Sequence, residues 1–276
     1  MTTLEDERNA ALVAWYAEHR RSLPWRTGSD PYRVLVSELM LQQTRADRVI
    51  PFFESFLDRF PTIEALAGAP FTEVAGAWSG LGYNRRAKNL HRAARVIVAK
   101  GWPDTVAGLE ELPGVGPYTA RALASIAFGM RVPAVDTNVR RVLSRWHGEQ
   151  LDGAALGAAA DVDVGADAGT WNQAMMDLGA ALCRPRAPRC DACPVHAWCA
   201  GPEVYAPPRR QARFEGSLRQ IRGAVVRQLV TGAASIEDLT RATGFDADDV
   251  EDAVDSLIDD DFVAETEDGT FELSEE

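Results

Sequence analysis

Residues 112–120 read Leu-Pro-Gly-Val-Gly-Pro-Tyr-Thr-Ala. The stretch separates a predicted helix that ends near Glu111 from a second one that runs from Pro117 to about Phe128. Proline suits the first turn of a helix, where its missing amide has no intrahelical partner in any case. The two glycines let backbone N–H groups approach an anion without a Cβ in the way, and the helix N-terminus adds a favourable dipole. The residues therefore predict a corner between two helices that can hold a phosphate, although Gly-x-Gly by itself is equally compatible with an ordinary corner.

All four cysteines of the chain fall in one 17-residue window with the spacing C-x6-C-x2-C-x5-C. Thiolates gathered this densely suit soft metals, and four of them fit either a tetrahedral zinc or a [4Fe–4S] cluster. Zinc sites commonly show two C-x2-C pairs, and here there is one. We therefore expect a [4Fe–4S] cluster in preference to zinc, with Cys183, Cys190, Cys193 and Cys199 as ligands.

A disulfide is the weakest interpretation of these cysteines. The chain opens with the charged run 4–8, so we expect no signal peptide, and a cytosolic compartment keeps thiols reduced. No window approaches the roughly 18 apolar residues of a membrane span. We expect a cytoplasmic, nucleoid-associated monomer without a membrane partner.

The formal net charge of −12 over 276 residues is unevenly distributed. Residues 1–214 hold 25 Lys+Arg and 23 Asp+Glu, a net +2, whereas residues 215–276 hold 4 and 18, a net −14. The acidity belongs to the tail. The nearly neutral remainder is compatible with a nucleic-acid partner, while the tail repels phosphates.

Helical periodicity dominates residues 1–200, and no stretch there shows sustained period-two alternation, so we expect an all-α fold. Residues 201–214, rich in proline and arginine, predict a linker. Beyond it, helices are expected over 218–230, from the N-cap Ser235 onward and over 246–260, followed by a hairpin turning at 267–269. Residues 215–276 therefore predict a small, acidic, winged-helix-like domain.

The hairpin string resembles the helix–hairpin–helix of DNA glycosylases, and the resemblance extends over most of residues 8–200. In that family an aspartate follows the hairpin by about twenty residues, where this chain has Asp136 in Val-Asp-Thr-Asn-Val, and a four-cysteine loop comes next, as in endonuclease III. The chain is most similar to the adenine DNA glycosylase branch, the MutY family, through the strings at 23–26, 37–44, 80–83 and 172–179. The resemblance implies a two-lobed domain over 1–200, with a six-helix lobe over about 25–133 and an iron–sulfur lobe formed by 1–24 and 134–200.

Two carboxylates have the surroundings that base excision needs. Breaking an N-glycosidic bond passes through a transition state with oxocarbenium character, so a proton is needed at the leaving base and a negative charge beside the sugar. Glu38 stands among apolar residues of the segment 34–41, and burial there favours its protonated form. Asp136 precedes an apolar helix face and can cap that helix, where the dipole favours the ionised form. Such a pair suits an acid and an anion.

Taken singly, Asp136 is more simply an N-cap and Glu38 a solvated helix residue. The resemblance reverses both interpretations. It implies that Glu38 protonates the adenine leaving group and that Asp136 stabilises the sugar cation or its covalent intermediate, with Asn138 and Tyr118 in support. In the bifunctional endonuclease III type, a lysine two residues beyond the second hairpin glycine forms a Schiff base, but Tyr118 stands there and a phenol cannot form an imine. The sequence therefore predicts a monofunctional glycosylase.

A base inside a duplex must be flipped out before it can be excised, and a side chain must fill the gap. The resemblance implies that Gln42 and Tyr83 insert into the base stack and that Gln173 and Arg26 read or hold the flipped adenine. Considered alone, Tyr83 is more typical of a core aromatic and Gln173 of a surface polar residue. The expected DNA-binding set is Arg26, Gln42, Gln43, Thr44, Tyr83, Gly114, Val115, Gly116 and Gln173. The three arginines between the first two cysteines face either phosphates or solvent.

The chain departs from the family pattern in two places. Usual members continue into a Nudix-like domain that recognises 8-oxoguanine, and residues 215–276 are too short and too helical for one, so we expect a packing, partner-binding or solubility module. Residues 136–138 read Asp-Thr-Asn where Asp-Gly-Asn is usual. Three functions follow in order of preference: an adenine glycosylase acting on double-stranded DNA with a mismatched adenine, a thymine or uracil mismatch glycosylase of the same fold, and a non-catalytic iron–sulfur DNA-binding protein.

Overall fold

The structure is a computed structural model that describes residues 4–204 and 214–275. The chain forms two compact units. The first comprises Met1–Val34, Asp104–Glu111 and Val115–Arg210, and the second comprises Leu35–Pro103, Leu112–Gly114 and Gln211–Glu276. The domain boundaries expected from the sequence stay a prediction, and the linker expected over 201–214 lies for the most part outside the described residues.

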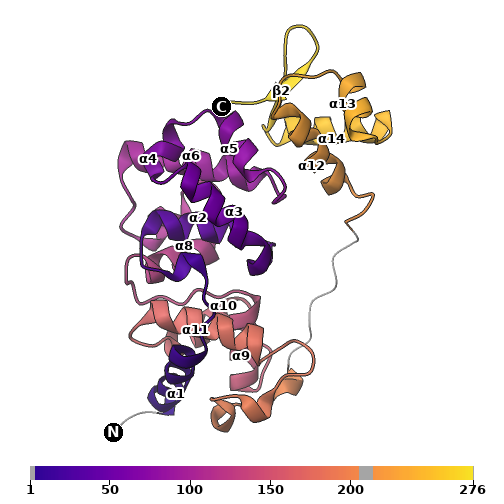
Figure 1. Ribbon diagram of the computed structural model, residues 1–276. Coiled ribbons are helices and arrows are strands. Elements are labelled where there is room, and N and C mark those ends of the chain that lie inside the picture. Colours follow the sequence, from indigo (N-terminus) through magenta and orange to yellow (C-terminus); the bar gives the residue numbers. More distant parts are fainter. Residues whose placement is uncertain (1–3, 205–213, 276) are drawn as a thin grey trace. The chain divides into compact units, whose positions relative to one another are not determined.

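The first unit is helical throughout its described part. Its helices are α1 (Leu4–His19), α7 (Val106–Glu110), α8 (Pro117–Ile126), α9 (Thr137–His147), α10 (Gly153–Asp163) and α11 (Ala168–Ala181), with short 3-10 turns η1 (Pro24–Arg26), η2 (Cys190–Ala192), η3 (His196–Trp198) and η4 (Pro202–Val204). Figure 1 shows α1, α9, α10 and α11 packed together. The apolar face expected downstream of Asp136 is confirmed, because its side chains lie buried in this core: Val139, Val142, Leu143 and Trp146.

The second unit begins in the middle of α2 (Pro31–Leu41) and continues with α3 (Ala46–Arg59), α4 (Ile63–Gly68), α5 (Phe71–Trp78) and α6 (Arg85–Lys100). Its largest fully buried side chains include Phe53, Phe56, Phe71 and Trp78. Phe56 and Trp78 meet edge to face with ring centroids 6.0 Å apart, an arrangement that aromatic quadrupoles favour.

The acidic tail belongs to the second unit and has the expected elements. They are α12 (Leu218–Leu229), α13 (Ile236–Thr243), α14 (Ala247–Asp259) and the antiparallel pair β1 (Val263–Glu265) and β2 (Phe271–Leu273), in which Val263 faces Leu273. Ser235 caps α13 as predicted, its side chain accepting from the Asp238 amide. β1 and β2 are the only strands in the described part of the chain, which confirms the all-α class with a small helical tail that ends in a hairpin.

No helix among residues 4–204 and 214–275 is long and apolar enough to cross a membrane.

Candidate active site

The hairpin between α7 and α8 forms as the sequence predicts. Gly116 is the N-cap of α8 with extended backbone (φ −90°), and Pro117 occupies the first turn. Gly114 has φ +76°, a conformation that L-residues adopt at a cost, and a Cβ built on it would lie 2.6 Å from Cβ of Asn89 in α6. A Cβ on Gly116 would have no heavy atom within 4 Å. Packing therefore explains the first glycine, whereas the second leaves open space at the N-terminus of α8, where a helix attracts anions.

Glu38 lies in the last two turns of α2 and is 7% exposed, so the burial expected from its apolar neighbours is confirmed. Leu35, one turn before it, and Leu39, directly after it, are fully buried. Its carboxyl group is therefore largely withdrawn from water. Its role as a proton donor stays a prediction.

Arg86, in the first turn of α6, joins the two segments that are predicted to insert into DNA. It is 6% exposed, and its Nη1 donates to the carbonyl oxygens of Met40 and Gln42, both at 2.6 Å, where α2 ends. Its Nη2 donates to the Gly82 carbonyl at 2.8 Å, and its guanidinium lies 5.2 Å from the Tyr83 ring centroid. Burial lowers the pKa of Arg86 to about 10, which leaves it charged at pH 7. One buried cation therefore fixes the backbone of both segments.

The backbone at these two segments is strained. Gln43 has φ +55° and Tyr83 has φ +50°, two of the four non-glycine residues with positive φ in the described chain. Such conformations cost on the order of 1–3 kcal/mol and persist where the surroundings impose them, often at ligand contacts. Gln42 is also tied to the hairpin, since its Nε2 donates to the Gly114 carbonyl at 3.2 Å. The structure thus brings together Gln42, the neighbouring Gln43 and Thr44, Tyr83 and Gly114 within the second unit.

Asp136 caps α9, as predicted from its position before the apolar face. Its Oδ1 accepts from the amides of Asn138 and Val139 at 2.8 and 2.7 Å, and its Oδ2 accepts from Asn138 Nδ2 at 2.8 Å. Asn138 Oδ1 accepts in turn from Nη2 of Arg141 at 2.8 Å. The carboxylate orientation is therefore fixed by three hydrogen bonds and supported by a buried arginine one turn further along.

Tyr118, in the first turn of α8, lies with its hydroxyl 3.7 Å from the sulfur of Met176 in α11. Val115 beside it is buried. The position where the bifunctional type carries a lysine is thus filled by a phenol that packs against a thioether. No amine for imine formation stands at this position.

Gln173 and Arg26 already have hydrogen-bond partners within the first unit. Gln173 Oε1 accepts from the Tyr16 hydroxyl at 2.7 Å. Arg26 forms a two-point ion pair with Asp177, at 2.7 and 3.1 Å, and its guanidinium lies 5.7 Å from the Tyr16 ring centroid. Burial alone would raise the pKa of Asp177, but hydrogen bonds and ion pairs with Arg26 and Arg21 outweigh burial and hold that pKa below its usual value. The two predicted adenine-reading residues meet here in one network on a single face of α11, and their contact with a base stays a prediction.

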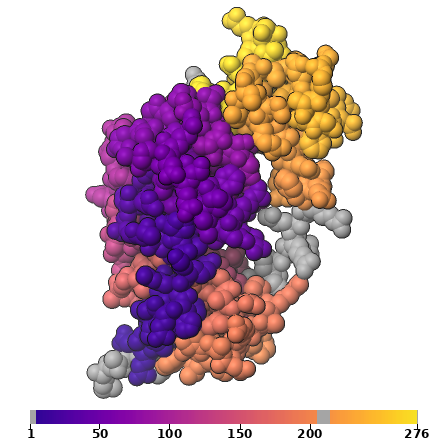
Figure 2. Space-filling model, viewed as in Figure 1, coloured from indigo at the N-terminus to yellow at the C-terminus, as the bar shows by residue number. Residues whose placement is uncertain are grey.

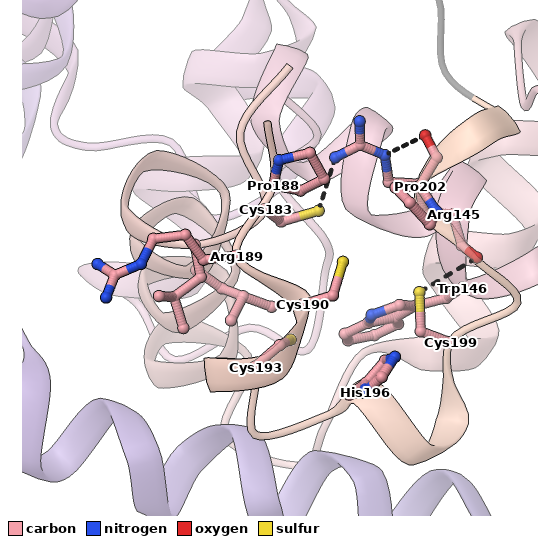
Figure 3. A pocket seen from close by; sticks show the side chains of 12 residues that line it. Arg145, Trp146, Cys183, Pro188, Arg189, Cys190, Cys193, His196, Cys199 and Pro202 are labelled. Atoms are coloured by element: carbon pink, nitrogen blue, oxygen red, sulfur yellow. Dashed lines mark hydrogen bonds between the residues drawn. The ribbon is translucent and has the colours of Figure 1, made fainter. Parts of the chain in front are cut away.

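The four cysteines line one pocket, shown in Figure 3, that is partly open to solvent. Its wall includes Trp146, His196 and Arg145, and the last of these donates from Nη1 to Sγ of Cys183 at 3.2 Å. Arg145 is 2% exposed and also donates to the carbonyl oxygens of Arg184 and Pro202 at 2.8 and 3.1 Å. A buried cation beside the sulfurs suits a group in which they carry negative charge.

The thiol chemistry of the pocket fits a metal group. Burial raises the pKa of Cys190, Cys193 and Cys199, that of Cys193 to about 11, so that without a metal these groups are neutral thiols at pH 7. Within the described ranges no three His, Cys, Asp or Glu side chains come together as they would around one metal ion. Four thiols that line one pocket can serve as metal ligands once they are deprotonated.

The sequence interpretation missed Arg141 and Arg145, which connect the carboxylate to the cysteine loop. Besides its bond to Asn138, Arg141 donates to the carbonyl oxygens of Cys183 and Gly179 at 2.7 and 2.8 Å. Positions 138, 141 and 145 share one face of α9 because they follow helical spacing. That spacing can be read from the sequence. The groups that the two arginines contact cannot.

A family model described as the HhH-GPD superfamily of base excision DNA repair proteins matches residues 36–154. An adenine DNA glycosylase of Mycobacterium tuberculosis is 42% identical over 280 residues, which cover 95% of this chain and 92% of the relative. The chain belongs to the adenine DNA glycosylase family. Two further family members are similar to it: that of Mycolicibacterium smegmatis at 40% identity over 96% of this chain and 95% of the relative, and the human protein at 40% over 68% and 38%.

Two solved structures share the fold of this chain. A thermostable thymine-DNA glycosylase matches with a TM-score of 0.67 at 30% identity, covering 72% of this chain and 96% of that chain. A trapped endonuclease III–DNA intermediate matches with a TM-score of 0.60 at 22% identity and the same coverage, which supports the fold alone. Because the mycobacterial alignments cover about 95% of the chain, most of the acidic tail lies within them, whereas the human alignment is shorter.

Proposed function

We propose that this protein is a monofunctional adenine DNA glycosylase of base excision repair, which hydrolyses the N-glycosidic bond of adenine mispaired with guanine or 8-oxoguanine in double-stranded DNA. The observation that carries the proposal is Glu38, a buried carboxyl group in the string 37–44 of a chain that belongs to the adenine DNA glycosylase family. A buried acid is what an adenine leaving group requires, because the base departs readily only when it is protonated.

In the proposed reaction Glu38 donates its proton to a ring nitrogen of adenine. The bond between the base and C1′ then breaks, and its electron pair leaves with the protonated base. Asp136 stabilises the positive charge that develops on the sugar, and Asn138 holds its carboxylate in place through Nδ2. A water oxygen finally bonds to C1′ and releases a proton to solvent, from which the Glu38 carboxylate regains the proton it gave. Free adenine and an abasic site remain.

Tyr118 supports the monofunctional assignment. Strand cleavage of the bifunctional kind needs an amine that forms a Schiff base with the sugar, and a phenol cannot supply one. Its hydroxyl lies against Met176. The abasic strand is therefore expected to remain intact until alkali or another enzyme cuts it.

DNA contacts are proposed at the strained segments and at the hairpin. Gln42 and Tyr83 fill the gap left by the flipped base, with Gln43 and Thr44 beside them, and Arg86 keeps both segments rigid so that little ordering is needed on binding. The amides of Val115 and Gly116, at the N-terminus of α8, bind a backbone phosphate. Arg26 and Gln173 then exchange their present partners for the flipped adenine.

A [4Fe–4S] cluster bound by Cys183, Cys190, Cys193 and Cys199 is the proposed cofactor. The pocket offers four sulfurs and the buried Arg145 as a hydrogen-bond donor to one of them. The four cysteines would bind the cluster as thiolates, and this ligation would order residues 183–199 against α9. Arg141, which donates to both the Cys183 carbonyl and Asn138, would then link the ordered loop to the side chains of Asn138 and Asp136.

A second candidate is a thymine or uracil mismatch glycosylase. It is favoured by the 30% identity to the thymine-DNA glycosylase and by threonine at position 137. Duplexes that contain A opposite 8-oxoG, A opposite G, T opposite G and U opposite G, each incubated with the protein and then treated with alkali, separate the possibilities. We expect strand breaks only at adenine. Breaks at thymine or uracil alone would support the second candidate, and their absence from all four duplexes would support a non-catalytic DNA-binding protein.

A further inference from the structure

The acidic tail is fastened to α5 and α6 by buried contacts. Lys88 of α6 is 3% exposed, and its ammonium group donates to the carbonyl oxygens of Asp261 and of Ser274, the latter at 3.2 Å. Phe71 at the start of α5 meets Phe262 edge to face, with ring centroids 5.2 Å apart and both rings about 1% exposed. Figure 2 shows the tail, in orange and yellow, against this part of the second unit. A buried lysine and an aromatic pair give the tail a fixed position on these helices.

Two polar contacts add to this attachment. The carboxylate of Glu275 accepts from the amides of Phe71 and Thr72 at 2.7 and 3.2 Å, where it satisfies N–H groups at the start of α5 that have no partner within the helix. Asp260 accepts from Arg85 of α6 at 3.0 Å and also pairs with Arg222 of α12. Helix α12 is thereby held close to residue 85 and so to the neighbouring loop that carries Tyr83.

Helix α12 places one arginine directly on Tyr83. Nη1 of Arg219 donates to the Tyr83 hydroxyl at 2.8 Å, and its guanidinium carbon lies 5.8 Å from the ring centroid. The guanidinium carbon of Arg86 lies 5.2 Å from the same centroid. Both distances are within the range in which a cation is attracted to an aromatic face. The ring of Tyr83 therefore lies beside one arginine from the helix that follows it, α6, and one from the tail.

The distribution of charge in the tail singles out this contact. The tail has 18 acidic residues and only 4 basic ones, all arginines, three of which lie on α12. Arg222 pairs with Asp260, and Arg241 pairs with Glu237 and Asp238 in its own helix. Helix α14, in contrast, carries six acidic residues, and Asp260 follows directly after it, so the surface that a winged helix would place on DNA repels phosphates here. The tail therefore has a route to influence DNA recognition that does not need α14: the contact between α12 and Tyr83.

We infer that Arg219 is a positioning residue. Through it the tail holds the Tyr83 ring in the orientation in which the ring inserts beside the flipped base. This orientation favours excision of adenine that stands opposite the correct base. The inference rests on the proposed function. A ring on a strained backbone loses less freedom on insertion when a hydrogen bond and a cation already restrict it. Most of the tail lies within the alignments with the two mycobacterial relatives, which therefore share this module.

The test is a double-mutant cycle of Arg219→Ala with Tyr83→Ala, read as the single-turnover excision rate at saturating enzyme for A opposite 8-oxoG and A opposite G. We expect Arg219→Ala to slow excision about 3- to 10-fold and to narrow the difference between the two substrates. In the Tyr83→Ala background the same change should have no further effect, because the side chain it acts on is gone. Arg227→Ala removes the same charge from an exposed position on α12 and should leave the rate unchanged.

Two further readouts separate positioning from other roles. The fluorescence of 2-aminopurine in place of adenine reports flipping, and we expect Arg219→Ala to reduce its rise, with Tyr83→Phe, which keeps the ring, giving a smaller reduction. The dependence of log Kd on log salt should keep its slope. A slope smaller by about one would mean that Arg219 neutralises a phosphate directly, and this would overturn the inference.

Faster excision by Arg219→Ala, an unchanged rate, or an equal loss in the Tyr83→Ala background would each overturn it as well. The excision rate of the wild-type protein in the same assay distinguishes failure of the proposed function from failure of the inference about Arg219. If it excises no adenine, the proposed function fails and the inference fails with it. If it excises adenine and the cycle shows no coupling, the inference alone fails.

Discussion

The two hairpin glycines, Gly114 and Gly116, should respond in opposite ways to the same substitution. At Gly114 an alanine must adopt φ +76°, which costs roughly 1–2 kcal/mol. Its Cβ would also lie 2.6 Å from Cβ of Asn89, an atom next to the backbone of α6 that cannot rotate away, so the hairpin or the helix must shift. Overpacking of this kind costs roughly 1–3 kcal/mol. Gly114→Ala is therefore expected to lower the free energy of unfolding by about 2–5 kcal/mol.

At Gly116 neither cost arises. Its φ is −90°, and a Cβ there meets nothing within 4 Å. Gly116→Ala should change the free energy of unfolding by less than about 1 kcal/mol, because the reduced freedom of the unfolded chain and the poorer suitability of alanine as an N-cap act in opposite directions. If a DNA phosphate approaches the N-terminus of α8, the new methyl group will stand in its way. We expect a loss of duplex affinity of about tenfold or more, equivalent to one charge-assisted hydrogen bond.

Urea denaturation followed by tryptophan fluorescence measures the first effect, with the m-value as a check that the unfolded state is unchanged. Fluorescence anisotropy with an undamaged duplex at one fixed salt concentration measures the second. Gly114→Ala should unfold at lower urea, and Gly116→Ala should bind DNA more weakly at wild-type stability. The reasoning is refuted if Gly114→Ala is as stable as the wild type, or if Gly116→Ala binds DNA normally.

Four other outcomes can be checked independently. Glu38→Gln and Asp136→Asn should each lower single-turnover excision by at least about 100-fold while the mismatched duplex is still bound, and a near-wild-type rate in either would remove that residue from its proposed role. Borohydride should trap no protein–DNA adduct with the wild type, whereas Tyr118→Lys supplies the amine that trapping needs; trapping by the wild type would contradict a monofunctional enzyme. Anaerobically purified protein should hold about four irons per chain and lose most of them in Cys193→Ser, and stoichiometric zinc without iron would refute the cluster. Lys88→Met should leave the carbonyl oxygens of Asp261 and Ser274 without their donor and make the tail more sensitive to limited proteolysis, with Lys100→Met on the exposed end of α6 as a control that should not.

The parts of this protein that follow from the sequence are those set by neighbours along the chain. The cap of Asp136 joins residues two and three positions apart, and the apolar face behind it repeats with the period of a helix. The burial of Glu38 follows from the apolar residues around it in one helix. The cysteine window, the hairpin and the tail elements are equally local, so spacing and turn chemistry suffice to predict them. Helix ends shift by only one or two residues, as at Ile126, where the expected helix ran to about Phe128.

Tertiary structure alone decided which distant groups meet. Arg86 reaches carbonyl oxygens 44 to 47 residues away, and Arg219 reaches Tyr83 across 136 residues. Hydrophobic periodicity tells which face of a helix is buried, but not which helix covers it, and an arginine in a helix looks the same in sequence whether it ends in solvent or on a buried carbonyl. The same holds for Gly114, whose need for hydrogen in place of a methyl group arises from Asn89 on a separate helix. Local spacing therefore determined the chemistry that the chain can carry, and packing determined how rigidly its parts are held.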